Sequence, residues 1–502
     1  PRLAARPVVR NPLGAPGRPR LLLFIGLYLL ASFGVGRYAA TRVHNTADYA
    51  VAGRSLPLAV VIATTFATWF GSETVLGVSA RFIDGNLGAV VEDPFGASMC
   101  LVLVGLFFAY KLYQKNLITL GDYYRQRYGR VIEVSCSAII MFSYLGWVAA
   151  QITALGLVFN LLTQGAVSVT MGMVIGTLVV LIYTLYGGMW SVAMTDFVQM
   201  IVIGVGLLAI AWFAADLAGG AGKVVEYAAR EGKFQFFPSG GVKEWTFFIA
   251  AAITMMLGSI PQQDVFQRVM SSNSPATARK GPVIGGVLYL LFAFIPMFVV
   301  TAAVLVMPET AQTLLKEDPQ KVLPTLVMEH MPIMLQVAFF GALLSAIMST
   351  ASATLLAPST TFVENILHNL RPGMTDQQTL KAMRISVLVF TACVLTYAIT
   401  MQGTSIYELV SGAYQVPLVG AFVPLVFGLY WKRATTQGAL LAVTMGLGVW
   451  LLFVASPMLS EAFPQQLAGV LAALVGMLGG SLAPQWIDDH KGHVTHYEGS
   501  AR

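Results

Sequence analysis

The segment ATWFGSE, residues 67–73, places polar groups inside a strongly apolar stretch of the chain. An ionisable side chain at membrane depth is costly, so Glu73 predicts a functional site unless it lies at the outer end of its span and reaches the interface. The neighbouring Gly71 and Ser72 favour a helix that is interrupted within the membrane, with its freed backbone groups facing a cavity. We therefore expect these three residues to bind solute.

A second interruption, LGSIPQQ (257–263), follows about 190 residues later and puts Gly258 and Pro261 into another apolar segment. Paired interruptions in the two halves of a chain are the best sequence indication of a transporter's central site. A kink or a close helix crossing is the alternative, because small residues are common at helix contacts in membranes. If the site is real, Gln262 and Gln263 join Glu73 in a pocket for a polar solute that carries hydrogen-bond donors.

Hydroxyl groups form a stripe on the helix expected around AIMSTAS (346–352). Ser345, Ser349 and Ser352 recur at i, i+4 and i+7, and Thr350 stands beside them. Such oxygens, together with carbonyls of an interrupted helix, could hold Na⁺. Each hydroxyl could instead bond a carbonyl of its own helix.

Asp196 lies in SVAMTDFVQM (191–200), shortly after a Gly187–Gly188 pair. It is consistent with an acid in the first helical turn, with a second cation ligand or with a proton relay.

The elements that must position these residues are membrane-spanning helices. The chain has 502 residues, of which 56% are hydrophobic and 11% charged, and its mean hydropathy is +0.72. These values predict an all-α polytopic membrane protein. About thirteen segments are long enough to cross a bilayer: 20–40, 55–80, 90–110, 131–162, 167–187, 190–215, 245–262, 283–307, 333–362, 383–401, 406–430, 438–456 and 466–484.

Loop charges predict the orientation. Basic residues such as Lys111, Lys115 and Arg127 concentrate in one alternate set of loops, which we assign to the cytoplasm together with a C-terminal tail at 485–502. The N-terminus is then outside, and the Pro- and Arg-rich stretch 1–19 is expected to be a disordered tail. A single membrane domain, 20–484, lies between the two tails.

Several functional classes find no support. The basic residues lie in short loops rather than on a soluble face, which argues against nucleic acid binding. The three cysteines are far apart, and no histidine stands in a metal spacing or beside a nucleophile, so we expect neither an enzyme nor any metal other than Na⁺.

Taken together, these motifs resemble the sodium:solute symporter family over residues 45–435. The stretches that carry the resemblance are AGRSLP (52–57), ATWFGSE (67–73), YTLYGGMWSVAMTDFVQ (183–199), FQRVMSS (266–272) and GALLSAIMSTASATLL (341–356). The resemblance implies a LeuT-type core of two inverted five-helix repeats, about 55–215 and 245–430. It also implies a sodium site formed by the carbonyls of Ala67, Phe70 and Ala346 and the hydroxyls of Ser349 and Thr350. Asp196, Ser345 and Ser352 would belong to a second cation site or to coupling.

Within the family, the motifs are most similar to the high-affinity choline transporter branch, in which Trp69 would form one wall of an aromatic cage. This chain has Gln262 where that branch has Trp. The expected solute is therefore a small cationic or polar organic molecule, namely a choline-like amine, an amino acid or a sugar. By position, Tyr407 and Tyr414 are expected to form the outer gate.

The resulting hypothesis is a sodium-coupled symporter that imports its solute by alternating access across the plasma membrane, taken to be a bacterial inner membrane. Proton coupling on the same fold is one alternative. A symporter-like sensor is another, although the short C-terminal tail would require a separate output protein. A channel is disfavoured because the polar residues gather at mid-depth instead of following whole helices.

Overall fold

The computed structural model describes residues 18–487, and its regular structure is helical throughout that range apart from one isolated backbone bridge. Ten of the described helices are long and apolar enough to cross a membrane, and up to twelve if each bent helix pair counts as one span. The predicted segment 167–187 corresponds to a shorter apolar stretch, Val169–Ile182. The all-α membrane architecture is confirmed, and the predicted count of thirteen is approximate.

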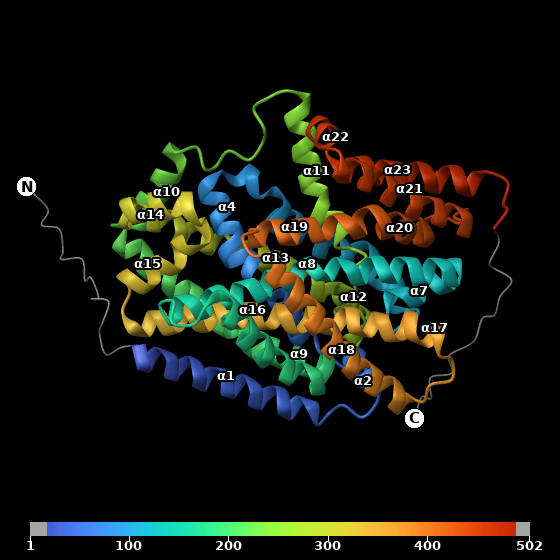
Figure 1. Cartoon of the computed structure of the whole chain (residues 1–502), viewed down its shortest axis with the longest axis horizontal. Coiled ribbons are helices and arrows are strands. Elements are labelled where there is room, and N and C mark those ends of the chain that lie inside the picture. Colours follow the sequence, from blue (N-terminus) through green and yellow to red (C-terminus); the bar gives the residue numbers. More distant parts are fainter. Residues whose placement is uncertain (1–17, 488–502) are drawn as a thin grey trace, which may run out of the picture.

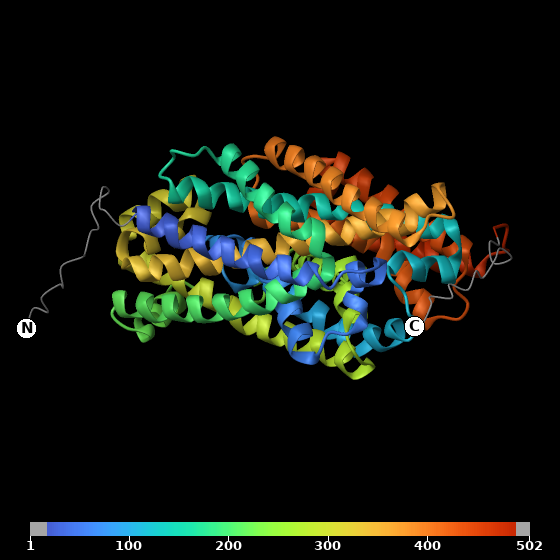
Figure 2. The same ribbon diagram turned by 90° about the horizontal axis from the view of Figure 1, so that it is seen from below.

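Most long helices run along the longest axis of the molecule (Figures 1 and 2). They are α1 (Arg18–Ala40), α8 (Arg130–Leu162), α9 (Val169–Leu217), α13 (Pro275–Val306), α16 (Ile333–Phe362), α18 (Asp376–Thr400), α21 (Thr436–Ala455) and α23 (Gln465–Leu482).

Shorter helices complete these spans and connect them. The first half of the chain contributes α2 (Thr46–Val51), η1 (Ala52–Arg54), η3 (Leu87–Val90), η4 (Val91–Gly96), α5 (Ala97–Leu103), η5 (Val104–Phe108), α6 (Ala109–Tyr113), α7 (Leu120–Tyr128) and α10 (Ala221–Arg230). The second half contributes α14 (Pro308–Glu317), η6 (Pro319–Lys321), α15 (Val322–His330), η7 (Val363–Leu367), α17 (His368–Leu370), α19 (Ile406–Pro417), η8 (Leu418–Phe422), α20 (Val423–Tyr430) and α22 (Pro457–Ala462).

Two spans are broken at the predicted positions. The helix α3 (Leu58–Trp69) is followed by η2 (Glu73–Gly77) and α4 (Val78–Asp84), with a bend of 53° at the break. The helices α11 (Val242–Gly258) and α12 (Gln263–Ser271) bend by 44°. Gly71 and Ser72 lie at the first break, and Gly258, Ser259 and Pro261 lie at the second. Glycine tolerates non-helical backbone angles and proline removes a helical hydrogen bond, so both spans depart from the helical path there.

The two broken spans are joined at one end. Leu56, just before α3, donates its N–H to the carbonyl of Ser271 at 2.9 Å and accepts from the N–H of Asn273 at 2.9 Å. These bonds form the isolated parallel bridge between Leu56 and Ser272.

The helix α16 forms the centre of the assembly, packing against α8, α9, α3 and α12. Next to it, α9 turns sharply at Gly188, whose φ of 49° is a left-handed conformation. A Cβ at this position would lie 2.4 Å from the carbonyl oxygen of Tyr49, so the close approach of α2 also requires glycine. The kink separates the segments predicted as 167–187 and 190–215.

The connecting helices gather at opposite ends of the molecule. In Figure 1, α10, α14 and α15 lie at one end, and α7 and α17 lie at the other. The predicted tails fall almost wholly outside the described residues: α1 already begins at Arg18, and only residues 485–487 of the C-terminal tail are described.

Candidate functional site

The break after α3 exposes backbone groups at the centre of the fold. Trp69 is the last helical residue, and Phe70 departs from the helix with φ −87° and ψ 71°. Glu73 is the first residue of the short π-helix η2, and its side chain is only 2% exposed. The acid therefore lies deep in the protein rather than at the end of a span, which excludes the interfacial interpretation of Glu73.

Two side chains of α8 hold the Glu73 carboxylate. Gln151 donates its amide N–H to Oε2 at 2.6 Å, and the Trp147 indole N–H donates to Oε1 at 3.2 Å. The Gln151 carbonyl oxygen also accepts the backbone N–H of Ser72 at 3.0 Å. One glutamine thus fixes both the carboxylate and the broken backbone beside it.

Sequence analysis did not identify Trp147 or Gln151 as site residues. They stand four positions apart on one face of α8, and a glutamine inside the apolar span 131–162 was an available indication of a polar neighbour.

Glycine is required at position 71 by close approach. A Cβ there would lie 2.4 Å from Glu73 Oε2, 2.7 Å from Thr350 Oγ1 and 3.0 Å from Gln151 Oε1. The acid, the α16 hydroxyl and the α8 amide therefore converge on the bare backbone of Gly71.

Trp147, which donates to the acid, packs against two further aromatic rings. Trp69 and Trp147 are 5.8 Å apart between ring centroids, Trp147 and Tyr414 are 5.3 Å apart, and Trp69 and Tyr414 are 6.1 Å apart. All three side chains are fully buried. We call these three residues, Trp69, Trp147 and Tyr414, the aromatic cluster.

Several buried polar atoms on the same elements lack a hydrogen-bond partner among the described residues. They are the hydroxyl oxygens of Ser72, Ser259 and Tyr414 and the amide oxygen of Gln262. Buried polar groups are rarely left unpaired, and each requires an explanation. A solute or ordered water would supply the missing partners.

The hydroxyl stripe of α16 divides into two kinds of residue. Ser349 donates to Asp196 Oδ1 at 2.5 Å, and Thr350 donates to the carbonyl of Thr68 at 2.7 Å. Ser352 instead bonds a carbonyl of its own helix at 2.9 Å, and Ser345 bonds a carbonyl of its own helix at 2.6 Å as well as the hydroxyl of Tyr28 on α1. Only the first pair faces the broken helix and α9.

Asp196 is fully buried and belongs to a network that spans four helices. Besides Ser349, it accepts hydrogen bonds from Thr64 and, at 3.4 Å, from Thr68. Thr68 also accepts from the guanidinium of Arg268 at 2.6 Å, which connects α3 to α12. Arg268 is 1% exposed and was not identified as a site residue from the sequence.

The chain matches the sodium:solute symporter family model over residues 49–446. It belongs to the sodium:solute symporter family. It is therefore a sodium-coupled transporter of a small organic solute, with Na⁺ as the coupling ion and a multi-pass integral membrane fold.

Relatives within this group carry different solutes. The chain is 30% identical to the human high affinity choline transporter 1 over 458 residues, covering 85% of this chain and 75% of the relative. It is 27% identical to the high-affinity proline transporter PutP of Bacillus subtilis over 464 residues, covering 90% and 95%. The Vibrio parahaemolyticus sodium/glucose cotransporter is 22% identical over 520 residues, covering 93% and 91%.

Solved structures share the fold of this symporter. The substrate-bound outward-open state of a Na⁺-coupled sialic acid symporter matches with a TM-score of 0.79 at 20% identity, covering 94% of this chain and 99% of that one. The structure of MhsT in complex with L-phenylalanine matches with a TM-score of 0.55 at 14% identity, covering 84% and 98%. The LeuT-type fold expected from the motifs is confirmed.

The two glutamines of the second break take different positions in the symporter. Gln262 donates to the hydroxyl of Ser143 at 2.8 Å, and its amide oxygen has no hydrogen-bond partner within residues 18–487. Gln263 turns away from Glu73: its amide bonds the backbone of Leu120 at 2.8 Å and of Ile118 at 3.2 Å. Gln263 thus anchors α12 to the start of α7.

The two tyrosines expected at the gate lie at different depths. Tyr414 belongs to the aromatic cluster. Tyr407 lies two turns earlier on α19, where its backbone approaches Gly77 at the end of η2 and its ring faces the guanidinium of Arg81 at 6.0 Å.

Proposed function

We propose that this symporter transports a small organic cation of the substituted ammonium class. The observation that carries the proposal is the buried Glu73 carboxylate bonded to Trp147, one of the three rings of the aromatic cluster. An ammonium group over an aromatic face gains about 0.5–2 kcal/mol per contact. The buried carboxylate adds the opposite charge that a neutral sugar would not require.

Further polar atoms define the rest of the solute. The unpaired oxygens of Ser72, Ser259 and Gln262 would bind a hydroxyl or similar group on the cation. Gly71 lets that group approach the broken backbone. An amine with a hydroxyl substituent therefore fits better than a sugar, and the similarity to choline transporters supports the same class.

Na⁺ is proposed to lie between the α3 break and α16. Its ligands would be the carbonyl oxygens of Ala67, Phe70 and Ala346 and the hydroxyl oxygens of Ser349 and Thr350. This set fits a hard cation that prefers oxygen, and two observations support it: Phe70 has left the helical path, and both hydroxyls face other helices rather than their own.

A second cation, or the coupling step itself, is proposed to depend on Asp196. This carboxylate shares Ser349 with the proposed sodium site and is linked through Thr68 to Arg268. Ser345 and Ser352 bond carbonyls of their own helix, which makes them the weaker members of the predicted set.

Transport would proceed by alternating access. Na⁺ binding would bring the α3 break closer to α16 and would fix the positions of Gly71 and Glu73 for solute binding. Ion and solute then increase each other's affinity by the same factor. Inward movement of one positive charge gains about 2.3 kcal/mol per 100 mV of membrane potential. Tyr414 would close over the solute, and Tyr407 would close the path beyond it.

The symporter is proposed to lie in the plasma membrane, in bacteria the inner membrane, with its C-terminus in the cytoplasm. The concentration of basic residues in the loops around α7 and α17 supports this orientation.

Uptake by the purified protein in liposomes tests the proposal. Labelled choline, proline, glucose and a carboxylate are compared with and without an inward Na⁺ gradient, and with a proton gradient in its place. We expect only choline to accumulate, and only in the presence of the Na⁺ gradient. Accumulation of proline or glucose instead would refute the cation assignment, and proton-driven uptake would refute sodium coupling. Binding without accumulation would favour a sensor.

A further inference from the structure

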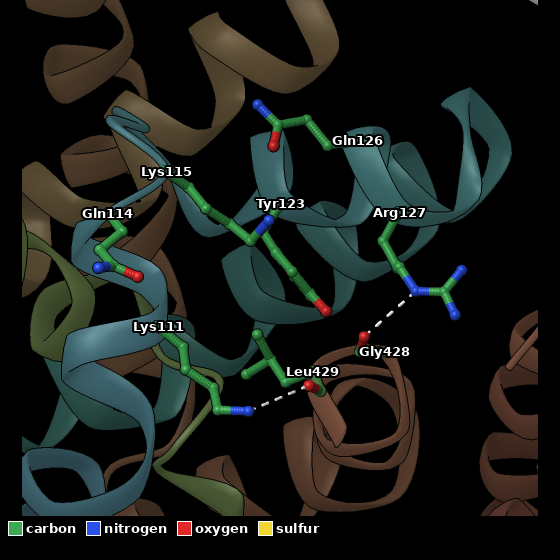
Figure 3. Close-up of a pocket in the computed structure, with 8 residues that line it drawn as sticks. All are labelled: Lys111, Gln114, Lys115, Tyr123, Gln126, Arg127, Gly428 and Leu429. Carbon is green, nitrogen blue, oxygen red and sulfur yellow. Dashed lines mark hydrogen bonds between the residues drawn. The ribbon is translucent and has the colours of Figure 1, made fainter. Parts of the chain in front are cut away.

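A basic pocket of about 500 Å³ lies at the end of the molecule where α6, α7 and α20 meet, and none of its lining residues belongs to the proposed solute or sodium sites (Figure 3). None of the eight residues that line it is acidic. They are Lys111, Gln114, Lys115, Tyr123, Gln126, Arg127, Gly428 and Leu429.

Arg127 has a structural role in this pocket. Its guanidinium donates to the carbonyls of Gly428 at 3.2 Å and Ala434 at 2.8 Å, where α20 ends. A cation at a helix C-terminus satisfies free carbonyls and the helix dipole. These bonds account for Arg127, one of the three basic residues that line the pocket.

The two lysines are not explained in the same way. Lys111 reaches the carbonyl of Leu429 only at 3.5 Å, and the ammonium of Lys115 lies 5.8 Å from the centre of the Tyr123 ring. Neither forms an ion pair with an acid of the described residues. Two cations without a counter-charge at one concave site attract an anion.

Tyr123 supplies an independent observation. Its side chain is 1% exposed, and its hydroxyl is buried without a hydrogen-bond partner among the residues that the structure describes. In Figure 3 the hydroxyl lies within the pocket, between the two lysines and Arg127. A buried hydroxyl that has no partner among the described residues and lines the same pocket as two ammonium groups completes a donor set suited to phosphate oxygens.

Two exposed aromatic side chains lie beside the pocket and form what we call its apolar rim, Phe107 and Tyr430. Phe107 is 53% exposed and Tyr430 is 47% exposed, and the Tyr430 hydroxyl donates to the carbonyl of Phe107. The ammonium of Lys111 lies 4.0 Å from the centre of the Tyr430 ring, so the charged pocket and the apolar rim are continuous. This arrangement fits a molecule with an anionic head and hydrocarbon chains.

We propose that this pocket binds a phosphate group through Lys111, Lys115 and Tyr123, and that the group belongs to an anionic phospholipid whose acyl chains lie along Phe107 and Tyr430. A free phosphate shares the same head chemistry but would make no use of the apolar rim. The proposal does not depend on the identity of the transported solute.

Native mass spectrometry of the full-length protein in detergent tests the proposal, with phosphatidylglycerol, phosphatidylcholine and inorganic phosphate as separate probes. We expect phosphatidylglycerol to bind with a preference over phosphatidylcholine. Replacing both lysines, K111Q with K115Q, should weaken that binding about fivefold for each lysine, because each basic residue near a membrane surface contributes roughly that factor. Y123F should weaken it about threefold without changing any charge, which corresponds to one hydrogen bond.

The control is K280Q, which removes an exposed lysine of α13 outside the pocket. It should leave lipid binding unchanged. Inorganic phosphate that binds as tightly as the lipid, and competes with it, would support the anion site but assign it to a soluble ligand. Equal loss in K280Q and in the lysine double variant, together with no effect of Y123F, would overturn the proposal by reducing it to non-specific surface charge. Folding of each variant is checked by its thermal unfolding.

Discussion

Glu73 is the residue on which solute selection is expected to depend. In Glu73→Gln, the side chain keeps its length but loses the charge that would face an ammonium group. A hydrogen bond to a charged group contributes about 1.5–3 kcal/mol, so we expect KM for the amine to rise roughly 10- to 100-fold. The Na⁺ concentration that gives half-maximal uptake should change by less than about twofold.

Uptake titrations of solute and of Na⁺ in proteoliposomes measure this difference, with Glu309→Gln, an exposed acid on α14, as the control. If Na⁺ dependence changes and solute KM does not, Glu73 is an ion or proton residue instead.

Ser349 and Thr350 are expected to determine Na⁺ affinity. Their replacement by Ala removes an oxygen ligand and should raise the Na⁺ concentration for half-maximal uptake about three- to tenfold in each case, since one polar contact contributes about 0.5–1.5 kcal/mol. Thr354→Ala is a matched control, because the Thr354 hydroxyl lies on the same helix but bonds the carbonyl of Thr350. Unchanged Na⁺ dependence in both variants would remove these residues from the proposed site.

The polar residues of this site could be predicted from the sequence because each interrupts an apolar segment. Glu73, Ser349, Thr350 and Asp196 all lie at the core of the fold. Trp147 could not be recognised in the same way, since a tryptophan in an apolar span has the same pattern whether it faces lipid or a ligand. Its contact with Glu73 joins residues 74 positions apart, and no local pattern reports that pairing.

At the scale of elements, both helix breaks could be located from Gly and Ser, with Pro261 added at the second, but the directions of the side chains beyond them could not be predicted. Gln262 has extended backbone angles, φ −87° and ψ 139°, and Gln263 is the first helical residue. Their side chains therefore diverge, one toward Ser143 and the other toward the backbone near Leu120. A one-residue difference at a helix start decides which glutamine can reach the solute.

The first break also yields a test at this scale. Gly71→Ala would place a Cβ 2.4 Å from Glu73 Oε2 and 2.7 Å from Thr350 Oγ1. Overpacking of this kind costs about 1–3 kcal/mol. We expect the added methyl group to displace the Glu73 carboxylate and the Thr350 hydroxyl, and the solute affinity to fall about tenfold or more.

Solute binding by isothermal titration at fixed Na⁺ measures the effect. Gly412→Ala on α19 is the control, because a Cβ there has no neighbour within 4 Å. Wild-type affinity in Gly71→Ala would mean that the break does not pack closely against the acid during binding.

The orientation of the whole molecule is testable by labelling. Lys432 lies in the predicted cytoplasmic set of loops, and Glu309 lies on α14 at the other end. With Cys introduced at either position, a membrane-impermeant maleimide should label Glu309→Cys in intact cells and Lys432→Cys only after the membrane is opened. The native Cys100 and Cys136 are buried, and the unmodified protein reports any background from Cys393. The reverse pattern would invert the assignment.

The bridge at Leu56 limits how this transporter can open. Two backbone hydrogen bonds connect Leu56, just before α3, to the end of α12, so the two broken spans are joined at that end. An opening between the two spans at that end would require both hydrogen bonds to break. While both bonds remain, the start of α3 and the end of α12 move together as one unit.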